Sequence, residues 1–205
     1  MEYSLWGSTS DSQCSRTLRL LSAAIGMQPI GYRECTLAYA RSQSSLHVKL
    51  VTGIEGDAYE EGRGWLEGQQ WRVMVEDIPE AGGNRPVTSR LSIASAVREG
   101  NAMQFLEMMG YVAAFQYFTQ GFRFVHNDVV ILVFKVSRPN ALYGKEVGTV
   151  GSGWIVHAAV KVRNATDAES SRKAMDQLRV LKNELRDVIE LKEANRSSLD
   201  TRYKR

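Results

Sequence analysis

Few of the residues that commonly do chemistry stand at spacings that would let them act together. The three histidines, His47, His126 and His157, lie in different predicted elements and share no carboxylate partner nearby in the sequence. The two cysteines, Cys14 and Cys35, have no Cys or His neighbour at metal-ligand spacing. We therefore expect strand or turn histidines, free thiols and no metal site.

Two loops are rich in acid or glycine but lack the pattern of a binding site. Asp57, Glu60 and Glu61 miss the spacing of a calcium-binding loop. The glycines of "GTVGSG", residues 148–153, are not followed by the Lys-Ser or Lys-Thr that begins a phosphate-binding helix. Both segments are interpreted as solvated loops, and neither a cofactor nor a catalytic residue is predicted.

Hydrolysis of a triphosphate inside a β-tunnel would need alternating carboxylates on one strand and basic residues on the facing strands. Glu2 stands alone on the first predicted strand, with Ser4 where a second carboxylate would be. Residues 119–121 are Thr-Gln-Gly in the middle of a long strand, and Arg123 is its only basic residue. In the next strand, residues 129–137, the only charged residue is Lys135. We expect the tunnel to be filled or apolar, and the protein not to be an enzyme.

The elements that would position these residues are mostly strands. Alternating patterns predict strands at residues 1–7, 32–41, 46–52, 69–78, 90–99, 112–125, 129–137 and 154–162. Helical spacing predicts helices at residues 14–27, at 101–109 and from 167 onwards, with loops at 53–68, 79–89 and 138–153. This order favours a mainly β fold: a closed antiparallel eight-stranded barrel with short N-terminal and mid-chain helices and a long C-terminal helix.

Length and composition are those of one soluble, intracellular domain. The chain has 205 residues, of which 43% are hydrophobic and 24% charged. The net charge of +3 is too small to argue for nucleic-acid binding, and no apolar run reaches the roughly 20 residues of a membrane span. We expect a domain over residues 1–195 and a frayed, basic tail over residues 196–205.

The strand at residues 129–137 is apolar on both faces, although one face of a barrel strand is normally polar. One face carries Val129, Ile131 and Val133, and the other carries Val130, Leu132 and Phe134. One of the two faces would fill the core, and either the C-terminal helix or a partner protein would cover the outer one. The residues expected to anchor a partner are Tyr117, Phe118, Phe134 and Trp154.

Three passages together resemble the Mediator subunit 18 family. They are the opening "MEYSLWGS", the passage "NAMQFLEMMGYVAAFQYFTQGFRFVHNDVVILVFKV", and "WIVHAAVKV" followed by the long helix from Asp167. Between about residues 32 and 98 only the order of the strands is similar.

The resemblance implies a barrel related to the triphosphate-tunnel enzymes but without their activity. It also implies a place in the head module of Mediator, the nuclear coactivator of RNA polymerase II. The partners implied are subunit 20, itself a similar barrel, and a helix from the C-terminus of subunit 8, with no cofactor. The alternatives are a diverged triphosphate-tunnel phosphohydrolase or polyphosphate-binding barrel, and a barrel that holds a small apolar ligand.

Overall fold

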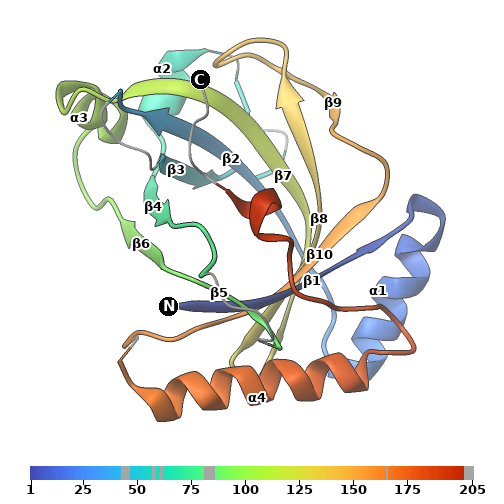
Figure 1. Ribbon diagram of the computed structural model, residues 1–205. Helices are drawn as coiled ribbons and strands as arrows, with labels where there is room; N and C mark the ends of the chain where they lie inside the picture. Colours follow the sequence, from blue (N-terminus) through green and yellow to red (C-terminus); the bar gives the residue numbers. More distant parts are fainter. Residues whose placement is uncertain (43–46, 57–58, 61, 81–85, 165, 201–205) are drawn as a thin grey trace.

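The computed structural model describes residues 1–42, 47–56, 59–60, 62–80, 86–164 and 166–200. One strongly curled antiparallel sheet dominates it, with helices on the outer side of the curl (Figure 1). The strands are β1 (Glu2–Thr9), β2 (Ile30–Ala40), β3 (Val48–Gly53), β4 (Arg72–Glu76), β5 (Thr88–Arg90), β6 (Ser92–Ala96), β7 (Val112–His126), β8 (Val129–Pro139), β9 (Glu146–Thr149) and β10 (Trp154–Lys161). The helices are α1 (Asp11–Ile25), α2 (Arg63–Glu67), α3 (Ala102–Met108), α4 (Ala168–Glu184) and the 3₁₀ helix η1 (Arg196–Leu199).

The sheet has ten strands and is open, so the expected closed barrel of eight strands is wrong. The pairing path runs β5-β1-β10-β8-β7-β2-β3-β4-β6, with β9 added beside β8. β5 and β6, the two ends of this path, follow one another in the chain and are separated only by Leu91. β5 pairs with β1 and β6 pairs with β4, but β5 and β6 do not pair with each other, so the path does not close and the sheet is a curled half-barrel.

The helix ends follow local sequence signals. The Asn101 side chain accepts a hydrogen bond from the Gln104 amide and caps α3. Asp167 accepts from the Glu169 and Ser170 amides at the start of α4. Gly26, with a φ of 72°, ends α1 in the left-handed conformation that glycine adopts without strain.

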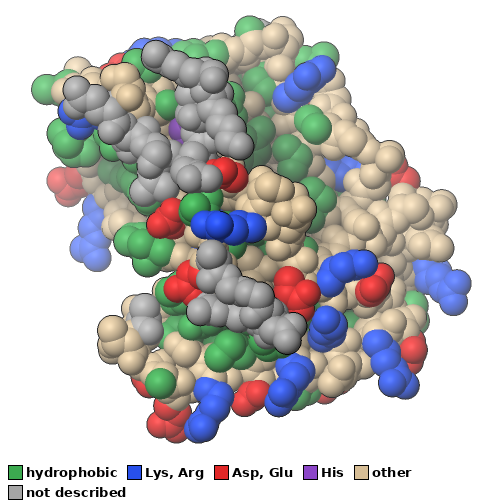
Figure 2. Space-filling model, in the orientation of Figure 1, with side chains coloured by type: hydrophobic (Ala, Val, Ile, Leu, Met, Phe, Trp, Pro, Cys, Tyr) green, Lys and Arg blue, Asp and Glu red, His purple; other side chains and the backbone are tan. Residues whose placement is uncertain are grey.

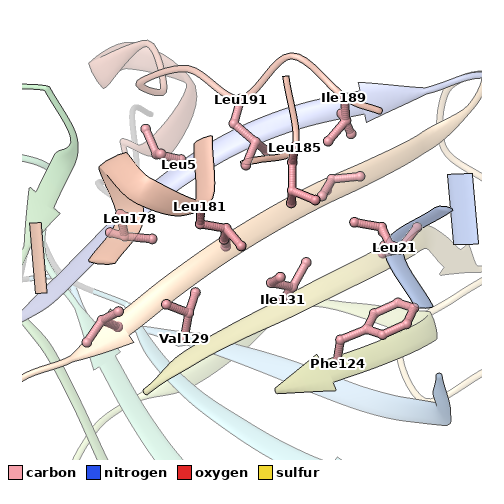
Figure 3. Packing of buried hydrophobic residues seen from close by; sticks show 14 of the residues in the cluster. Leu5, Leu21, Phe124, Val129, Ile131, Leu178, Leu181, Leu185, Ile189 and Leu191 are labelled. Atoms are coloured by element: carbon pink, nitrogen blue, oxygen red, sulfur yellow. The ribbon is translucent and has the colours of Figure 1, made fainter. Parts of the chain in front are cut away.

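The first hydrophobic core lies between the outer face of the sheet and the helices α1 and α4. Figure 3 shows β1, β7, β8 and β10 contributing side chains that meet those of both helices and of the segment after α4. Its labelled members are Leu5, Leu21, Phe124, Val129, Ile131, Leu178, Leu181, Leu185, Ile189 and Leu191. The C-terminal helix therefore covers one face of β8, which confirms that alternative for the face of Val129, Ile131 and Val133.

A second core lies on the same outer side, over β2, β3 and the first half of β7. It contains Leu37, Leu50, Leu66, Met103 and Phe118, so α2 and α3 cover this part of the sheet. The helix α2 and the strand β9 lie in segments that were expected to be loops. No helix in the described part of the chain is long and apolar enough to cross a membrane.

Candidate functional site: the concave face of the sheet

With both cores outside, the inner, concave face of the sheet is left to line a cavity of about 1440 Å³. Residues of β1, β2, β3, β4, β5, β6, β7, β8 and β10 line it, for the most part at alternating positions of each strand, and the lining extends to residues 162–164 and the first half of α4. In Figure 2, hydrophobic side chains form the floor of a hollow over β7 and β8.

A cluster of buried charges occupies one wall of the cavity. The Arg90 guanidinium binds Glu2 Oε1 at 2.8 Å and Glu76 Oε1 at 2.6 Å. Lys49 Nζ binds the other oxygen of Glu76 at 2.6 Å. These groups come from four different strands, and the side chains of Glu2, Glu76 and Arg90 are each at most 7% exposed. Burial of such charges is tolerable because each is paired.

The pairing controls the protonation of the cluster. Burial acts to raise the pKa of Glu76, but Lys49 and Arg90 outweigh it and hold this pKa below the usual value. Burial likewise acts to lower the pKa of Lys49, but the neighbouring Tyr117 and the Glu76 carboxylate raise it. Both groups therefore stay ionised at neutral pH.

His157 borders the cluster and remains uncharged. Burial lowers its pKa to about 4, against an opposing effect of the Glu2 carboxylate 3.9 Å away. Its ring stacks on the Trp6 indole with centroids 4.1 Å apart, which keeps it in an aromatic environment. This histidine serves as a packed neutral ring rather than as an acid or base.

The opposite wall of the cavity is an apolar stripe on β7, β8 and β10. Its members are Phe115, Tyr117, Val130, Leu132, Phe134, Val136, Ile155 and Ala159. Phe115 is 44% exposed, Val130 37% and Ile155 36%. These side chains belong to strands that are well packed on their other face, so the stripe is a rigid, water-exposed apolar surface.

This arrangement favours binding over catalysis. The carboxylates of Glu2 and Glu76 are each held by a cation of the same wall. Among the described residues there is no group of three or more His, Cys, Asp or Glu side chains that could hold a metal ion. The unsatisfied part of the cavity is its apolar stripe, which can gain free energy only by contact with apolar groups.

Comparison with known proteins identifies the family of the chain. A family model described as Med18 protein matches residues 47–202, well over half of the chain. The chain belongs to the Med18 family. A curated relative from Yarrowia lipolytica, named Mediator of RNA polymerase II transcription subunit 18, is 25% identical over 99% of both chains. The relative of that name from Aspergillus fumigatus is 30% identical, and the match covers 67% of this chain but only 56% of that protein.

Solved structures support the fold. A chain of the Schizosaccharomyces pombe Mediator head module superposes with a TM-score of 0.84 at 20% identity, over 94% of this chain and 98% of that one. The PH1819 protein from Pyrococcus horikoshii gives a TM-score of 0.57 at 12% identity, over 92% and 90% of the two chains. The Med18 half-barrel thus occurs in the head-module structure almost over its full length.

The four residues expected to anchor a partner do not share one surface. Tyr117 and Phe134 both line the cavity and belong to the apolar stripe. Phe118 is fully buried in the second core, because it follows Tyr117 on an alternating strand and faces the other side. Trp154 lies on the outer face, beside Phe122 with ring centroids 5.9 Å apart.

The interior was expected to be filled or apolar, and this is wrong for the wall of the cavity that carries the charge cluster. The sequence does show charges inside otherwise apolar alternating strands, as at Lys49 in "HVKLV" and Glu76 in "VMVED". A charge at such a position indicates a side chain that faces inward. Its partners lie on distant strands, however, so the cluster with Arg90 becomes visible only in the structure. Asp57 and Glu61 of the acidic loop lie outside the described residues.

Proposed function

We propose that the protein is a non-enzymatic scaffold subunit of the Mediator head module, a component of the nuclear coactivator that serves RNA polymerase II. Membership of the Med18 family supports a structural role. The relatives' name, and the head-module structure that shares this fold, support the place in Mediator. The domain over residues 1–195 is the unit that we propose to assemble.

The observation that carries the proposal is the unfilled apolar stripe of the concave face. An α-helix with its side chains is about 10–12 Å across and rises 1.5 Å per residue, so about ten helical residues take up a volume similar to that of the cavity, which is about 1440 Å³. We propose that an amphipathic helix from the C-terminus of Mediator subunit 8 lies in the cavity with its apolar side on Tyr117 and Phe134. Subunit 20 is proposed to bind the outside of the half-barrel, where Trp154 is the candidate contact.

Co-expression with subunit 20 and the C-terminal segment of subunit 8, followed by size-exclusion chromatography with light scattering, tests the assembly. The wild-type chain is expected to give a stoichiometric ternary complex. The variant with Tyr117→Asp and Phe134→Asp should lose the subunit 8 segment, because two carboxylates would be buried against apolar groups. A monomer that binds neither partner would contradict the proposal.

Matched variants separate the two proposed surfaces. Val180→Asp places the same charge on the outer side of α4, where Val180 is 54% exposed, and should leave the complex intact. Trp154→Ser should weaken only the binding of subunit 20. Retention of the subunit 8 segment by a folded Tyr117→Asp, Phe134→Asp protein would show that this helix binds elsewhere.

The alternative, a diverged triphosphate-tunnel phosphohydrolase or polyphosphate-binding barrel, is not favoured. The carboxylates that would bind metal are neutralised by Arg90 and Lys49. A phosphate would have to compete with these carboxylates for the two cations. Hydrolysis of tripolyphosphate with Mg²⁺ or Mn²⁺, lost on Glu2→Ala, would restore this alternative.

A further inference from the structure

The chain after Leu191 turns across the open side of the half-barrel (Figure 1). We call residues 192–200 the C-terminal strap. The strap ends in η1, and Ser198, Leu199 and Asp200 line the same cavity as the apolar stripe. A segment of this chain thus already occupies part of the opening through which a helix would enter.

The strap begins at a firm anchor. Trp6 and Lys192 exchange two backbone hydrogen bonds of 2.8 and 2.9 Å. Just before them, the Glu190 carbonyl and the Ile189 side chain pack so closely on Gly7 that a Cβ there would come within 2.8 Å of the carbonyl oxygen. Leu191 is 1% exposed. The chain is therefore part of the core up to Leu191.

Beyond Lys192 the strap is held lightly. The Ala194 amide donates to Thr88 Oγ1 at 2.8 Å, and Arg196 Nε donates to the Pro79 carbonyl at 2.9 Å. No residue from 192 to 200 is fully buried, and the 3₁₀ turn is capped from within by Asn195. Segments with little buried apolar area and solvent-accessible hydrogen bonds open first.

We infer that the strap is a displaceable lid over the cavity, hinged after Lys192, which a partner helix must move aside. The hydrogen bonds to Thr88 and Pro79 contribute a bias of about five- to thirty-fold towards the closed position of the strap. The identity of the entering helix rests on the proposed function. The opening of the strap does not, and it can be measured on the protein alone.

The first test uses a cysteine reporter inside the cavity. Leu132→Cys places a thiol in the apolar stripe, and Val180→Cys places a control thiol on the exposed side of α4. The native Cys14 and Cys35 are buried, and burial raises the pKa of Cys35 to about 12, so both react slowly. Reaction of each reporter with a neutral maleimide is followed by mass spectrometry.

Two changes release the strap. One combines Thr88→Val with Arg196→Ala, which removes both hydrogen bonds, and the other ends the chain at Glu193. Each is expected to speed labelling of the Leu132→Cys reporter by about five- to thirty-fold and to leave the Val180→Cys reporter unchanged. Equal rates with and without the strap would overturn the inference, as would a parallel rise at both reporters, which reports general loosening.

A second test measures competition directly. The released variants should bind the C-terminal segment of Mediator subunit 8 more tightly than the wild type, by the same factor as the gain in labelling. Faster labelling without tighter binding would overturn the displacement of the strap by that helix. If the segment binds no form of the protein, the proposed function fails, while the labelling result still decides whether the strap opens.

Discussion

Replacement of Arg90 by methionine tests how far the concave face depends on its buried charges. Arg90 is 6% exposed and is the closest cation to Glu2, at 2.8 Å from that carboxylate compared with 3.8 Å for Lys161. Arg90→Met keeps the aliphatic stem but removes the hydrogen-bonded cation of the buried Glu2, which keeps only the half-exposed Lys161 at 3.8 Å, while Lys49 still neutralises Glu76. Breaking a buried ion pair in this way costs about 3–5 kcal/mol.

The assay is urea denaturation followed by circular dichroism, together with a thermal melt. For a chain of this size, a loss of about 3–5 kcal/mol lowers the melting temperature by roughly 6–20 °C. Arg72→Met is the matched control, because Arg72 is 49% exposed and its pair with Glu34 at 3.0 Å is solvated. That variant should cost less than about 1 kcal/mol.

A second-site change completes the test. Glu2→Gln added to Arg90→Met removes the unpaired charge, and it should recover more than about 1 kcal/mol of the lost stability. If Arg90→Met is no worse than Arg72→Met, or if Glu2→Gln adds to the loss, then the cluster is not held together by its ion pairs and the argument is refuted.

Three further perturbations address other parts of the molecule. Gly121→Ala should abolish folding or destabilise it by several kcal/mol, because a Cβ there would lie 2.1 Å from the Val133 carbonyl oxygen; a folded variant of wild-type stability would contradict the close approach of β7 and β8. Because the pKa of His157 is about 4 when folded and 6.5 when unfolded, the unfolded chain binds more protons between these values. The contribution of the uncharged His157 to the free energy of unfolding is therefore complete above pH 6.5, and about 2 kcal/mol of it should be lost between pH 7 and pH 5. His157→Phe should remove this pH dependence of stability. Equal pH dependence in the two proteins would show that His157 is not the group responsible. Asp167→Ala removes the cap of α4 and should cost about 1 kcal/mol, whereas an unchanged denaturation midpoint would show that the cap is dispensable.

Much of the local structure was predictable because it depends on neighbouring residues. Asn101 and Asp167 begin α3 and α4 by binding amides two or three residues ahead. The turn between β7 and β8 lies at Asn127, where φ is 53°, and Asn is among the residues that tolerate this conformation. The segments that became α2 and β9 escaped prediction because they are short and have little periodicity.

The candidate site was only partly predictable, because alternation defines two faces of a strand without saying which one is covered. It placed Tyr117 and Phe118 on opposite faces, but only the helices decide that Phe118 lies in a core and Tyr117 in the cavity. The same ambiguity applied to Phe134, whose neighbour Val133 faces α4. An eight-stranded closed barrel was expected because alternation predicts strands without showing which of them pair, and the pairing path ends at β5 and β6 without joining them.

The sequence by itself determined the mainly β character, the long capped helix α4 and the resemblance to the Med18 family, since these follow from local patterns and short motifs. Only the tertiary structure decided that the cores lie outside the curl and that the inner face holds a charge cluster beside an apolar stripe. Glu2 and Arg90 meet across 88 positions of the chain. Such contacts depend on the register of distant strands and on where the helices dock, and these are set by the summed packing of the whole chain rather than by any one segment.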